Sequence, residues 1–378
     1  MPLQFTSVSR RWALTLFAPA LLLAALSARA DIVIGQVTPL TGPQGVTGRA
    51  IHAGVKLYFD SVNAGGGVRG QRIKLVVRDD VQKPEETVRL VKDLIGSQAP
   101  IALLGTVGTS NLEALANDGI LARSGVTMVG AISGADSVTQ ADGMLVVKAR
   151  YRDEVDRLFA TFAHLGIQRI GLVYQDDGLG KDVLAGATDA AKRRGVTLVG
   201  SVAYARNTTD TSVAASKMEE LAPQAIFLGA TTTAAIDFVT RYRSGHGAAM
   251  LYGMSIIDPD LLLKKVGVGP ARGYAFTTVL PLPTETNRAV VREYLKLCAA
   301  SPDPDLSARS LEGFIAAKAL VWGVRHATQL TPEAVADTLT RYGSFDVGDF
   351  ILNFSERGKP GSRYVDFAMI GSEGRFVR

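Results

Sequence analysis

The chain has 378 residues, of which 47% are hydrophobic and 20% are charged, and its formal net charge is +5. This apolar share excludes a disordered or collagen-like chain, and the length predicts two domains with ample hydrophobic cores. The single cysteine, Cys298, excludes an intramolecular disulfide and a cysteine-rich metal site.

The first thirty residues have the pattern of a cleaved export signal. Arg10 and Arg11 precede a short apolar stretch, and residues 28–30 (A-R-A) match a cleavage site. The stretch is shorter than the roughly 20 residues that span a bilayer, which argues against a membrane anchor. Residues 1–30 contain three arginines and no acid, so cleavage before Asp31 lowers the net charge to +2 and removes the indication of nucleic-acid binding. We expect a periplasmic protein, exported by the general or the twin-arginine route.

Short β-rich segments then alternate with amphipathic helical segments, which predicts mostly parallel sheets covered on both faces. In the first half, the expected elements are a strand at 32–34, a helix with its apolar face over 51–62, a strand at 73–77, a helix at 84–95, and strands at 101–104 and 127–129. A second alternation predicts a strand at 170–174, a helix at 181–194, a strand at 196–199, a helix at 211–221 and a strand at 225–228.

The restart of this alternation predicts an α/β fold of two doubly wound, Rossmann-like lobes. Crossings near 148–151 and 277–283, with a third after the last long helix, would form a multi-strand hinge. The expected division is a signal peptide at 1–30, a first lobe at 31–149 and 282–344, and a second lobe at 150–281 and 345–378. Ligands of open α/β sheets lie outside the carboxyl ends of the strands, so we expect the binding site between the lobes.

A formal G-x-G-x-x-G at 65–70 does not indicate dinucleotide binding. The glycines follow a helix and precede a strand, whereas a phosphate-binding fingerprint follows a strand and begins a helix. We interpret them as a helix end and turn. The sequence contains no G-x-S-x-G, H-E-x-x-H or P-loop motif, and its four histidines lie far apart. We therefore predict no catalytic residues, no metal site and no cofactor.

Two acidic pairs, at 79–80 and 176–177, each follow a predicted strand. Paired carboxylates can hold a cation or perform acid-base chemistry, but solvated turns and helix N-caps are the commoner explanation. We favour the second interpretation for both pairs.

Polar loops follow two neighbouring strands. Residues 105–111 (GTVGTSN) connect a strand to a helix, and residues 133–136 (SGAD) follow the next strand. Backbone N–H groups at a helix start, helped by hydroxyls, can hold a carboxylate without any arginine. Together the loops predict a site for a small anionic group.

The mature sequence resembles the periplasmic substrate-binding proteins of branched-chain amino acid ABC transporters. The resemblance begins with IVIGQVTPLTGPQGVTGRAIHAGVKLYFD and continues through LLGTVGTSNLEAL, RIGLVYQDDGLG, RNTTD, VLPLP and SLEGFIAAKALVWGVRHA. It implies the type I periplasmic binding protein fold, in which two lobes close over a ligand.

The resemblance also implies a set of ligand contacts. The carboxylate would be held by Thr109 and Ser110 and by the loop Ser133, Gly134 and Ala135, and the specificity candidates are Thr47, Leu179, Thr231, Thr232 and Ser255. Leucine-type binders have a glutamate for the ligand ammonium where this chain has Ser255. Asp176, Asp177 or Asp258 could replace it, or the ligand could lack an ammonium group, because burying one without a counter-charge costs several kcal/mol.

These observations predict an exported, monomeric solute-binding protein that captures a small carboxylate-bearing ligand, an amino acid or a related acid, and delivers it to an inner-membrane ABC permease. One alternative is a periplasmic sensor that presents its closed state to a signalling partner. Another is an exported hydrolase or isomerase that uses Asp176 or Asp177. Arg49, Arg150 and Arg206 could each line the cleft or be surface charges, and the surface is the default expectation.

Overall fold

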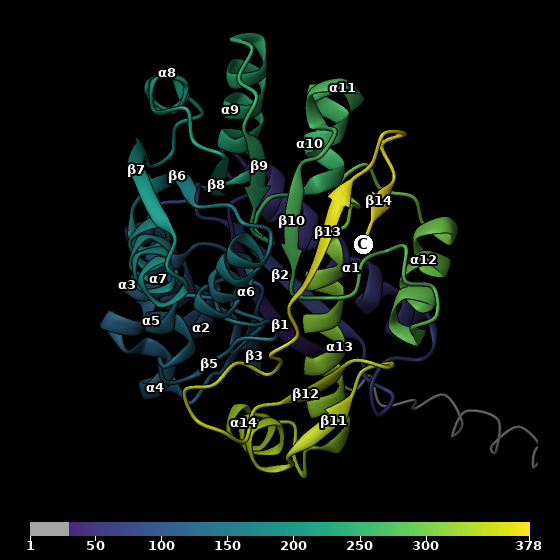
Figure 1. The fold of residues 1–378 in the computed structure, drawn as a ribbon. Helices are drawn as coiled ribbons and strands as arrows, with labels where there is room; N and C mark the ends of the chain where they lie inside the picture. The colour runs from purple at the N-terminus through teal and green to yellow at the C-terminus, as the bar shows by residue number, and fades with distance from the viewer. Residues whose placement is uncertain (1–29) are drawn as a thin grey trace, which may run out of the picture.

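The computed structural model describes residues 30–378. The predicted signal peptide therefore lies, apart from Ala30, outside the described residues. Within the described part of the chain, no helix is long and apolar enough to cross a membrane. The two-lobed α/β architecture predicted from the sequence is confirmed (Figure 1).

The first lobe contains a parallel sheet of five strands in the order β2, β1, β3, β4, β5. Its elements in chain order are β1 (Ile32–Thr38), α1 (Gly45–Ala64), β2 (Ile73–Asp79), α2 (Pro84–Gln98), β3 (Ala102–Leu104), α3 (Thr109–Asp118), α4 (Ile120–Ser124), β4 (Met128–Val129), α5 (Asp136–Thr139) and β5 (Met144–Leu145). Successive strand residues point to opposite faces: Leu104 packs in the cluster that contains α1 and α13, and Leu103 packs with Leu94 of α2 on the other side.

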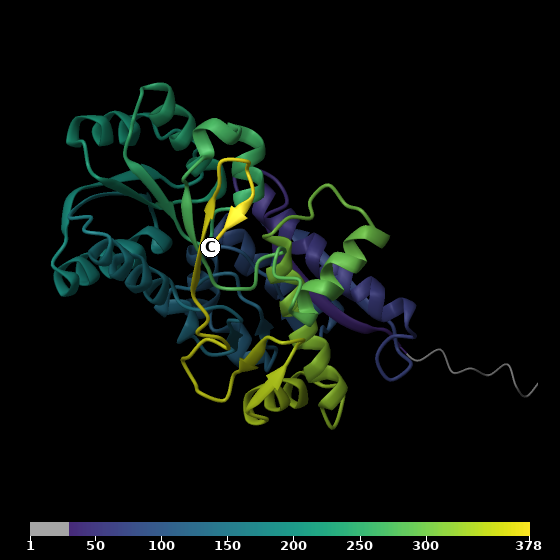
Figure 2. The ribbon, with the colours of Figure 1, turned by 45° about the vertical axis from the view of Figure 1, so that its right-hand side comes forward.

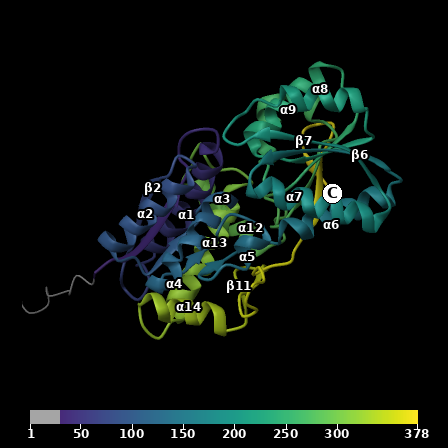
Figure 3. The same cartoon turned by 90° about the vertical axis from the view of Figure 1, so that its left-hand side faces the viewer.

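The second lobe contains seven strands in the order β14, β13, β10, β9, β8, β6, β7. Its elements are α6 (Tyr151–His164), β6 (Arg169–Asp176), α7 (Gly178–Arg194), β7 (Thr197–Ala205), α8 (Ser212–Leu221), β8 (Ala225–Gly229), α9 (Thr232–Ser244), β9 (Met250–Gly253), α10 (Pro259–Val266), α11 (Val268–Ala271), β10 (Ala275–Thr278), β13 (Asp366–Ile370) and β14 (Phe376–Val377). Only β13 and β14 run antiparallel to their neighbours. Figure 3 shows α8 and α9 on one face of this sheet and α6 and α7 on the other.

After β10, the chain returns to the first lobe. It forms α12 (Ala289–Ala300), α13 (Ser310–His326), α14 (Pro332–Arg341) and the hairpin of β11 (Ser344–Asp346) and β12 (Ile351–Asn353). Phe345 stacks on Trp322 of α13 with ring centroids 4.0 Å apart. Residues 345–354 therefore belong to the first-lobe core, whereas the sequence prediction assigned 345–378 to the second lobe.

Glycines allow α1 and α13 to approach closely. A Cβ on Gly54 of α1 would lie 1.9 Å from the Ser310 carbonyl oxygen, and one on Gly313 of α13 would lie 2.1 Å from the Ile51 carbonyl oxygen. Neither helix can move away without opening the core between them, so both positions exclude larger side chains.

The glycine-rich segment after α1 is a turn, as predicted. Gly65 caps the helix and β2 begins at Ile73. Gly67 has a φ of 78°, and a Cβ there would meet the Gln71 carbonyl oxygen at 2.0 Å. This position needs glycine because the conformation is left-handed and the space is filled.

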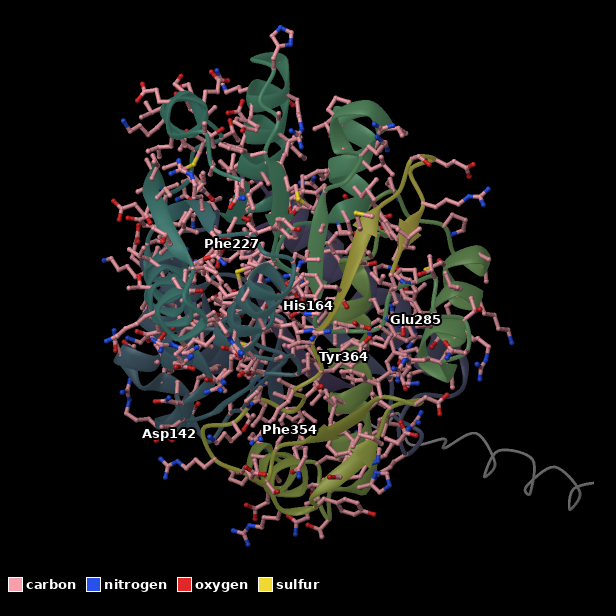
Figure 4. The ribbon with its side chains drawn as sticks, in the orientation of Figure 1. Asp142, His164, Phe227, Glu285, Phe354 and Tyr364 are labelled. Carbon is pink, nitrogen blue, oxygen red and sulfur yellow. The ribbon has the colours of Figure 1, made fainter. Side chains whose placement is uncertain are left out.

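The chain passes between the lobes three times, through 146–150, 279–288 and 354–365. The third crossing is the yellow segment that runs through the centre of Figure 2. Its two ends are marked by Phe354 and Tyr364 in Figure 4. Three crossings form a hinge that allows the lobes to move toward each other while remaining in register.

Candidate functional site

A narrow cleft lies between the lobes, and most of its lining residues lie near the ends of strands of the two sheets. The first lobe contributes Gln44, Thr47, Gln82, Val107, Gly108, Thr109, Ile132 and Arg309, and the chain from the first crossing onward contributes Tyr151, Gln175, Asp177, Leu179, Thr231 and Ile256. The lining combines hydroxyls, amides and apolar groups, which is typical of a site for a small polar molecule.

The two predicted polar loops meet at the first-lobe wall. Thr109 begins α3, and its Oγ1 lies 2.9 Å from Oγ of Ser133, which follows β4. Both side chains are buried, and Ser133 Oγ also accepts a hydrogen bond from the Ala135 N–H at 3.2 Å. The first N–H groups of a helix have no partner within the helix, so α3 presents donors beside this hydroxyl pair.

Ser110 points across the interface between the lobes. Its Oγ accepts a hydrogen bond from the Gly178 N–H at 3.3 Å and lies 3.5 Å from Asp177 Oδ2. It does not line the cleft. The structure therefore gives Ser110 a contact between the lobes, whereas Thr109 lines the cleft.

Gly134 and Ala135 do not line the cleft and lie behind residues that do. The Gly134 carbonyl accepts a hydrogen bond from the Tyr151 N–H at 2.8 Å, and a Cβ on Gly134 would lie 2.8 Å from Tyr151 Cδ1. Gly134 thus allows the ring of Tyr151, which lines the cleft, to lie against this loop. Ala135 is almost fully buried and belongs to the hydrophobic core.

Three more predicted residues, Thr47, Leu179 and Thr231, line the cleft and are buried. Thr231 is held in place by Tyr204, whose hydroxyl accepts a hydrogen bond from the Thr231 N–H at 3.0 Å. Thr232 is not in the lining. It accepts a hydrogen bond from the Asp258 N–H at 3.0 Å and thereby fixes the loop after β9.

Asp177 is the carboxylate in the lining of the cleft, and neighbouring groups form hydrogen bonds and an ion pair with it. Gln175 Nε2 donates to it at 2.7 Å, and the Gly180 N–H donates at 3.3 Å as expected for a helix N-cap. Arg206 Nε lies 3.4 Å away. Burial raises the pKa of Asp177, although the hydrogen bond from Gln175 and the charge of Arg206 act in the opposite direction.

Of the two positions left open for Arg206, surface or cleft, the structure favours the interface between the lobes. Its Nη2 reaches from the second lobe to the first and donates to the Gln82 carbonyl at 2.8 Å and to Asn111 Oδ1 at 2.7 Å. Arg206 therefore bridges the lobes. Arg49 pairs with Asp305, and Arg150 pairs with Asp136 of α5 and Asp153 of α6.

Ser255 binds a buried glutamate. Its N–H and its hydroxyl donate to the Glu154 carboxylate at 2.9 and 3.0 Å, and Thr277 Oγ1 donates at 2.5 Å. Glu154 is fully buried in α6, and burial raises its pKa, with the Lys148 ammonium acting in the opposite direction. Ser255 lines a second, small cavity, which shares Arg309 with the cleft.

Arg309 belongs to the lining of both cavities. It is 6% exposed, and its Nη1 donates to Oε2 of Glu312, one turn along α13. The other carboxylate oxygen of Glu312 lies 3.4 Å from Lys148 Nζ. Burial opposes the ionisation of Glu312, but Arg309 and Lys148 outweigh it and lower its pKa.

Sequence reasoning missed several lining residues. Gln82 and Gln175 lie at or just after the carboxyl ends of β2 and β6, so the rule that predicted Thr109 and Ser133 could also have found them. Tyr151 and Arg309 come from the ends of the first crossing and of the loop before α13, where no strand-end rule applies. Among residues 30–378, no group of three or more histidine, cysteine or acidic side chains is arranged to hold a metal ion.

Comparison with known proteins identifies the family. A model of the periplasmic binding protein family matches residues 31–375. The chain belongs to this family. The resemblance noted in the sequence and the type I periplasmic binding protein fold are thereby confirmed.

Individual relatives of this periplasmic binding protein agree with the family assignment. A substrate-binding periplasmic protein from Ralstonia solanacearum is 41% identical, with a TM-score of 0.89, and the match covers 92% of this chain and 99% of that one. An extracellular ligand-binding receptor from Verminephrobacter eiseniae is 26% identical, with a TM-score of 0.85, over 92% and 100% of the two chains. Leu/Ile/Val-binding protein homolog 8 from Brucella abortus is 29% identical over 51% of this chain, and the match spans about half of that relative's length.

Proposed function

We propose that this protein is an exported solute-binding protein that captures a small carboxylate-bearing ligand, an amino acid or a related acid, between its lobes. The observation that carries the proposal is the buried pair of hydroxyls on Thr109 and Ser133 at the start of α3. Hydroxyl and N–H donors that converge on one wall of a closed cleft suit a carboxylate. The ligand would then pass to an ABC permease in the inner membrane.

Closure of the lobes explains capture and release without chemistry. Gly178 donates to Ser110, Arg206 donates to Asn111, and Thr233 Oγ1 donates to the Pro43 carbonyl at 3.1 Å, so all three bonds join the lobes. A ligand that touches both walls adds further contacts that exist only in the closed state, and it therefore shifts the population toward closure. We infer that the protein acts as a monomer, because one chain supplies both walls of the cleft. We also infer that it uses no cofactor and catalyses no reaction.

The location and the ligand class belong to the same proposal. The sequence of residues 1–30 supports export to the periplasm. Proteins with this fold but low sequence identity have been solved with different ligands: isoleucine in a Streptococcus pneumoniae protein, at 16% identity, and benzoate in an R. palustris solute-binding protein, at 19% identity. Both ligands carry a carboxylate, so the shared fold supports an acid and leaves its other groups to be decided by the side chains of the cleft.

A thermal-shift panel on ligand-stripped protein tests the proposal. Each amino acid is compared with its des-amino acid and with the amide of that acid. A ligand at about a hundred times its dissociation constant should stabilise the fold by about 2.7 kcal/mol, whereas the amide should shift the melting temperature far less. Equal shifts by acids and amides, or no shift by any acid, would overturn the proposal. Copurification with a sensor kinase instead of a permease from membrane extract would favour the signalling alternative.

A further inference from the structure

We propose that Asp258 is a positioning residue for the ligand site: its carboxylate binds the Ser307 hydroxyl of the opposite lobe and so holds the loop that carries Arg309 at the cleft. The inference rests on the proposed function, because it assumes that the ligand binds in the closed cleft. Asp258 lines neither cavity, so it acts through the residues to which it is bonded and does not touch the ligand.

The loop between α12 and α13 (301–309) belongs to the first lobe. Leu306 packs against the first-lobe core, and the Ser307 carbonyl accepts a hydrogen bond from the Tyr294 hydroxyl at 2.9 Å. The last residue of the loop is Arg309, which is buried and belongs to the lining of both cavities. The position of this loop therefore sets part of the wall that a ligand meets.

Two carboxylates of the second lobe hold this loop. Both lie at the start of α10, where Asp258 is the N-cap and Asp260 belongs to the first turn. Ser307 Oγ donates to Asp258 Oδ2 at 2.6 Å, and the Ala308 N–H donates to Asp260 Oδ2 at 2.7 Å. Hydrogen bonds to an ionised acceptor are stronger than neutral ones. Because the donors and the acceptors belong to different lobes, both distances depend on the angle between the lobes.

Ser307 connects Asp258 to Arg309. Its Oγ accepts a hydrogen bond from the Arg309 N–H at 3.2 Å while it donates to Asp258. A hydroxyl has one proton, so donation to Asp258 leaves the lone pairs of Ser307 Oγ for the Arg309 N–H. Without the carboxylate acceptor, the hydroxyl is free to rotate, and the Arg309 N–H loses an aligned partner.

Asp258 is itself fixed to the opposite wall of the cleft. Its Oδ1 caps α10 by accepting from the N–H groups of Asp260 and Leu261 at 3.0 and 3.1 Å. Its own N–H donates to Thr232 Oγ1 at 3.0 Å, and Thr232 Oγ1 donates to the carbonyl of Ile256, which lines the cleft, at 3.4 Å. Hydrogen bonds therefore form a continuous path from a lining residue of the second lobe to the loop of the first.

Amide hydrogen exchange, measured by NMR on purified, ligand-stripped protein, tests the inference. None of these bonds involves a ligand atom, so we expect the stripped protein to form them. Asp258→Asn keeps an oxygen that can cap α10 but replaces the second acceptor oxygen with a donor. The Arg309 N–H should then exchange about tenfold or more faster, although the substitution lies in the other lobe. The amides of β8, in the core of the second lobe, should keep their exchange rates, which separates this effect from general destabilisation.

A double-mutant cycle shows whether Asp258 acts through Ser307. Ser307→Ala removes the connecting hydroxyl and should raise the exchange rate of the Arg309 N–H by a similar factor. Adding Asp258→Asn to Ser307→Ala should then change that rate by less than about twofold, because both substitutions break one bond. Asp210→Asn is the matched control and should change nothing. Asp210 also accepts from an N–H at a helix start, that of Ser212 at 3.0 Å, but it bonds only within the second lobe.

Isothermal titration calorimetry connects the loop to binding. The probes are leucine, its des-amino acid 4-methylpentanoate, and benzoate. For each probe that binds the parent chain, Asp258→Asn should weaken the affinity about tenfold, and Asp210→Asn should leave it within about twofold.

The outcomes distinguish the inference from the function on which it rests. The inference is wrong, and the proposed function stands, if the probes bind but Asp258→Asn leaves either the exchange of the Arg309 N–H or the affinity within twofold of the parent chain. Full additivity of Asp258→Asn and Ser307→Ala would also overturn the inference alone. If neither the three probes nor any acid of the thermal-shift panel binds, both are wrong.

Discussion

Replacing Thr109 with valine tests the carboxylate site directly. Valine keeps the branching and nearly the volume of threonine, so the change removes one hydroxyl from a side chain that is 3% exposed. Ser133 Oγ keeps its bond from the Ala135 N–H, which preserves the loop. The free energy of unfolding should therefore fall by only about 0.5 to 1.5 kcal/mol, the usual net contribution of a neutral hydrogen bond.

Ligand affinity should fall by more. A hydrogen bond to a charged group contributes about 1.5 to 3 kcal/mol, so loss of the Thr109 hydroxyl should weaken the binding of a carboxylate about tenfold to 150-fold. Isothermal titration calorimetry on stripped protein measures this change. Thr139→Val is the matched control, because Thr139 is equally buried but bonds to the Asp136 carbonyl outside the cleft; its affinity should stay within twofold. Binding by Thr109→Val within threefold of the parent chain would refute the placement of the carboxylate.

Three further changes test the contacts between the lobes and the buried acids. Arg206→Ala removes its bonds to the first lobe, so the unliganded protein should open, with a larger radius of gyration in small-angle scattering and affinity about tenfold lower. Glu154→Ala leaves the donors of Ser255 and Thr277 unpaired and should lower the free energy of unfolding by about 3 to 5 kcal/mol in urea titration, whereas Glu154→Gln should cost less. Burial, with the nearby Asp136, raises the pKa of Asp182 from 3.8 to about 6. Between these pH values Asp182 is protonated in the folded state and ionised in the unfolded state. The free energy of unfolding therefore falls as the pH rises from about 4 to about 6. Urea titration of Asp182→Asn should show a gain of about 1 to 3 kcal/mol at pH 7 and almost none at pH 3.5.

The alternation of strands and helices could be predicted because it depends on local chemistry. The helix expected at 84–95 is α2, and the strand expected at 225–228 is β8. The α2 segment has a helical periodicity, and the β8 segment is a short, continuous apolar run that is fully buried. The hairpin at 344–353 was assigned to the wrong lobe because its partner, Trp322, lies more than twenty residues earlier in the chain, and no local pattern reveals that contact.

Some residues of the candidate site could also be predicted from local sequence, and others could not. Thr109 and Ser133 could be placed together because each follows a strand, and neighbouring parallel strands end at the same edge. Arg309 could not be placed, since its position depends on how α13 packs against α1. The orientation of Ser110 toward Asp177 also required the structure, because it depends on how far the lobes have closed.

The order in which the chain enters each lobe has a consequence for folding. The second lobe is almost continuous from residue 151 to 278, but the first-lobe core joins Ile32 to Phe354 and needs α13 to fill the space beside Gly54. Contacts between such distant residues form slowly, because a long loop must close before they are made. A chain that has emerged only to residue 278 can build most of its second lobe, whereas residues 31–150 still lack α13, which completes the first-lobe core. For a protein that we propose to be exported, this order leaves the first-lobe core incomplete until synthesis is nearly finished.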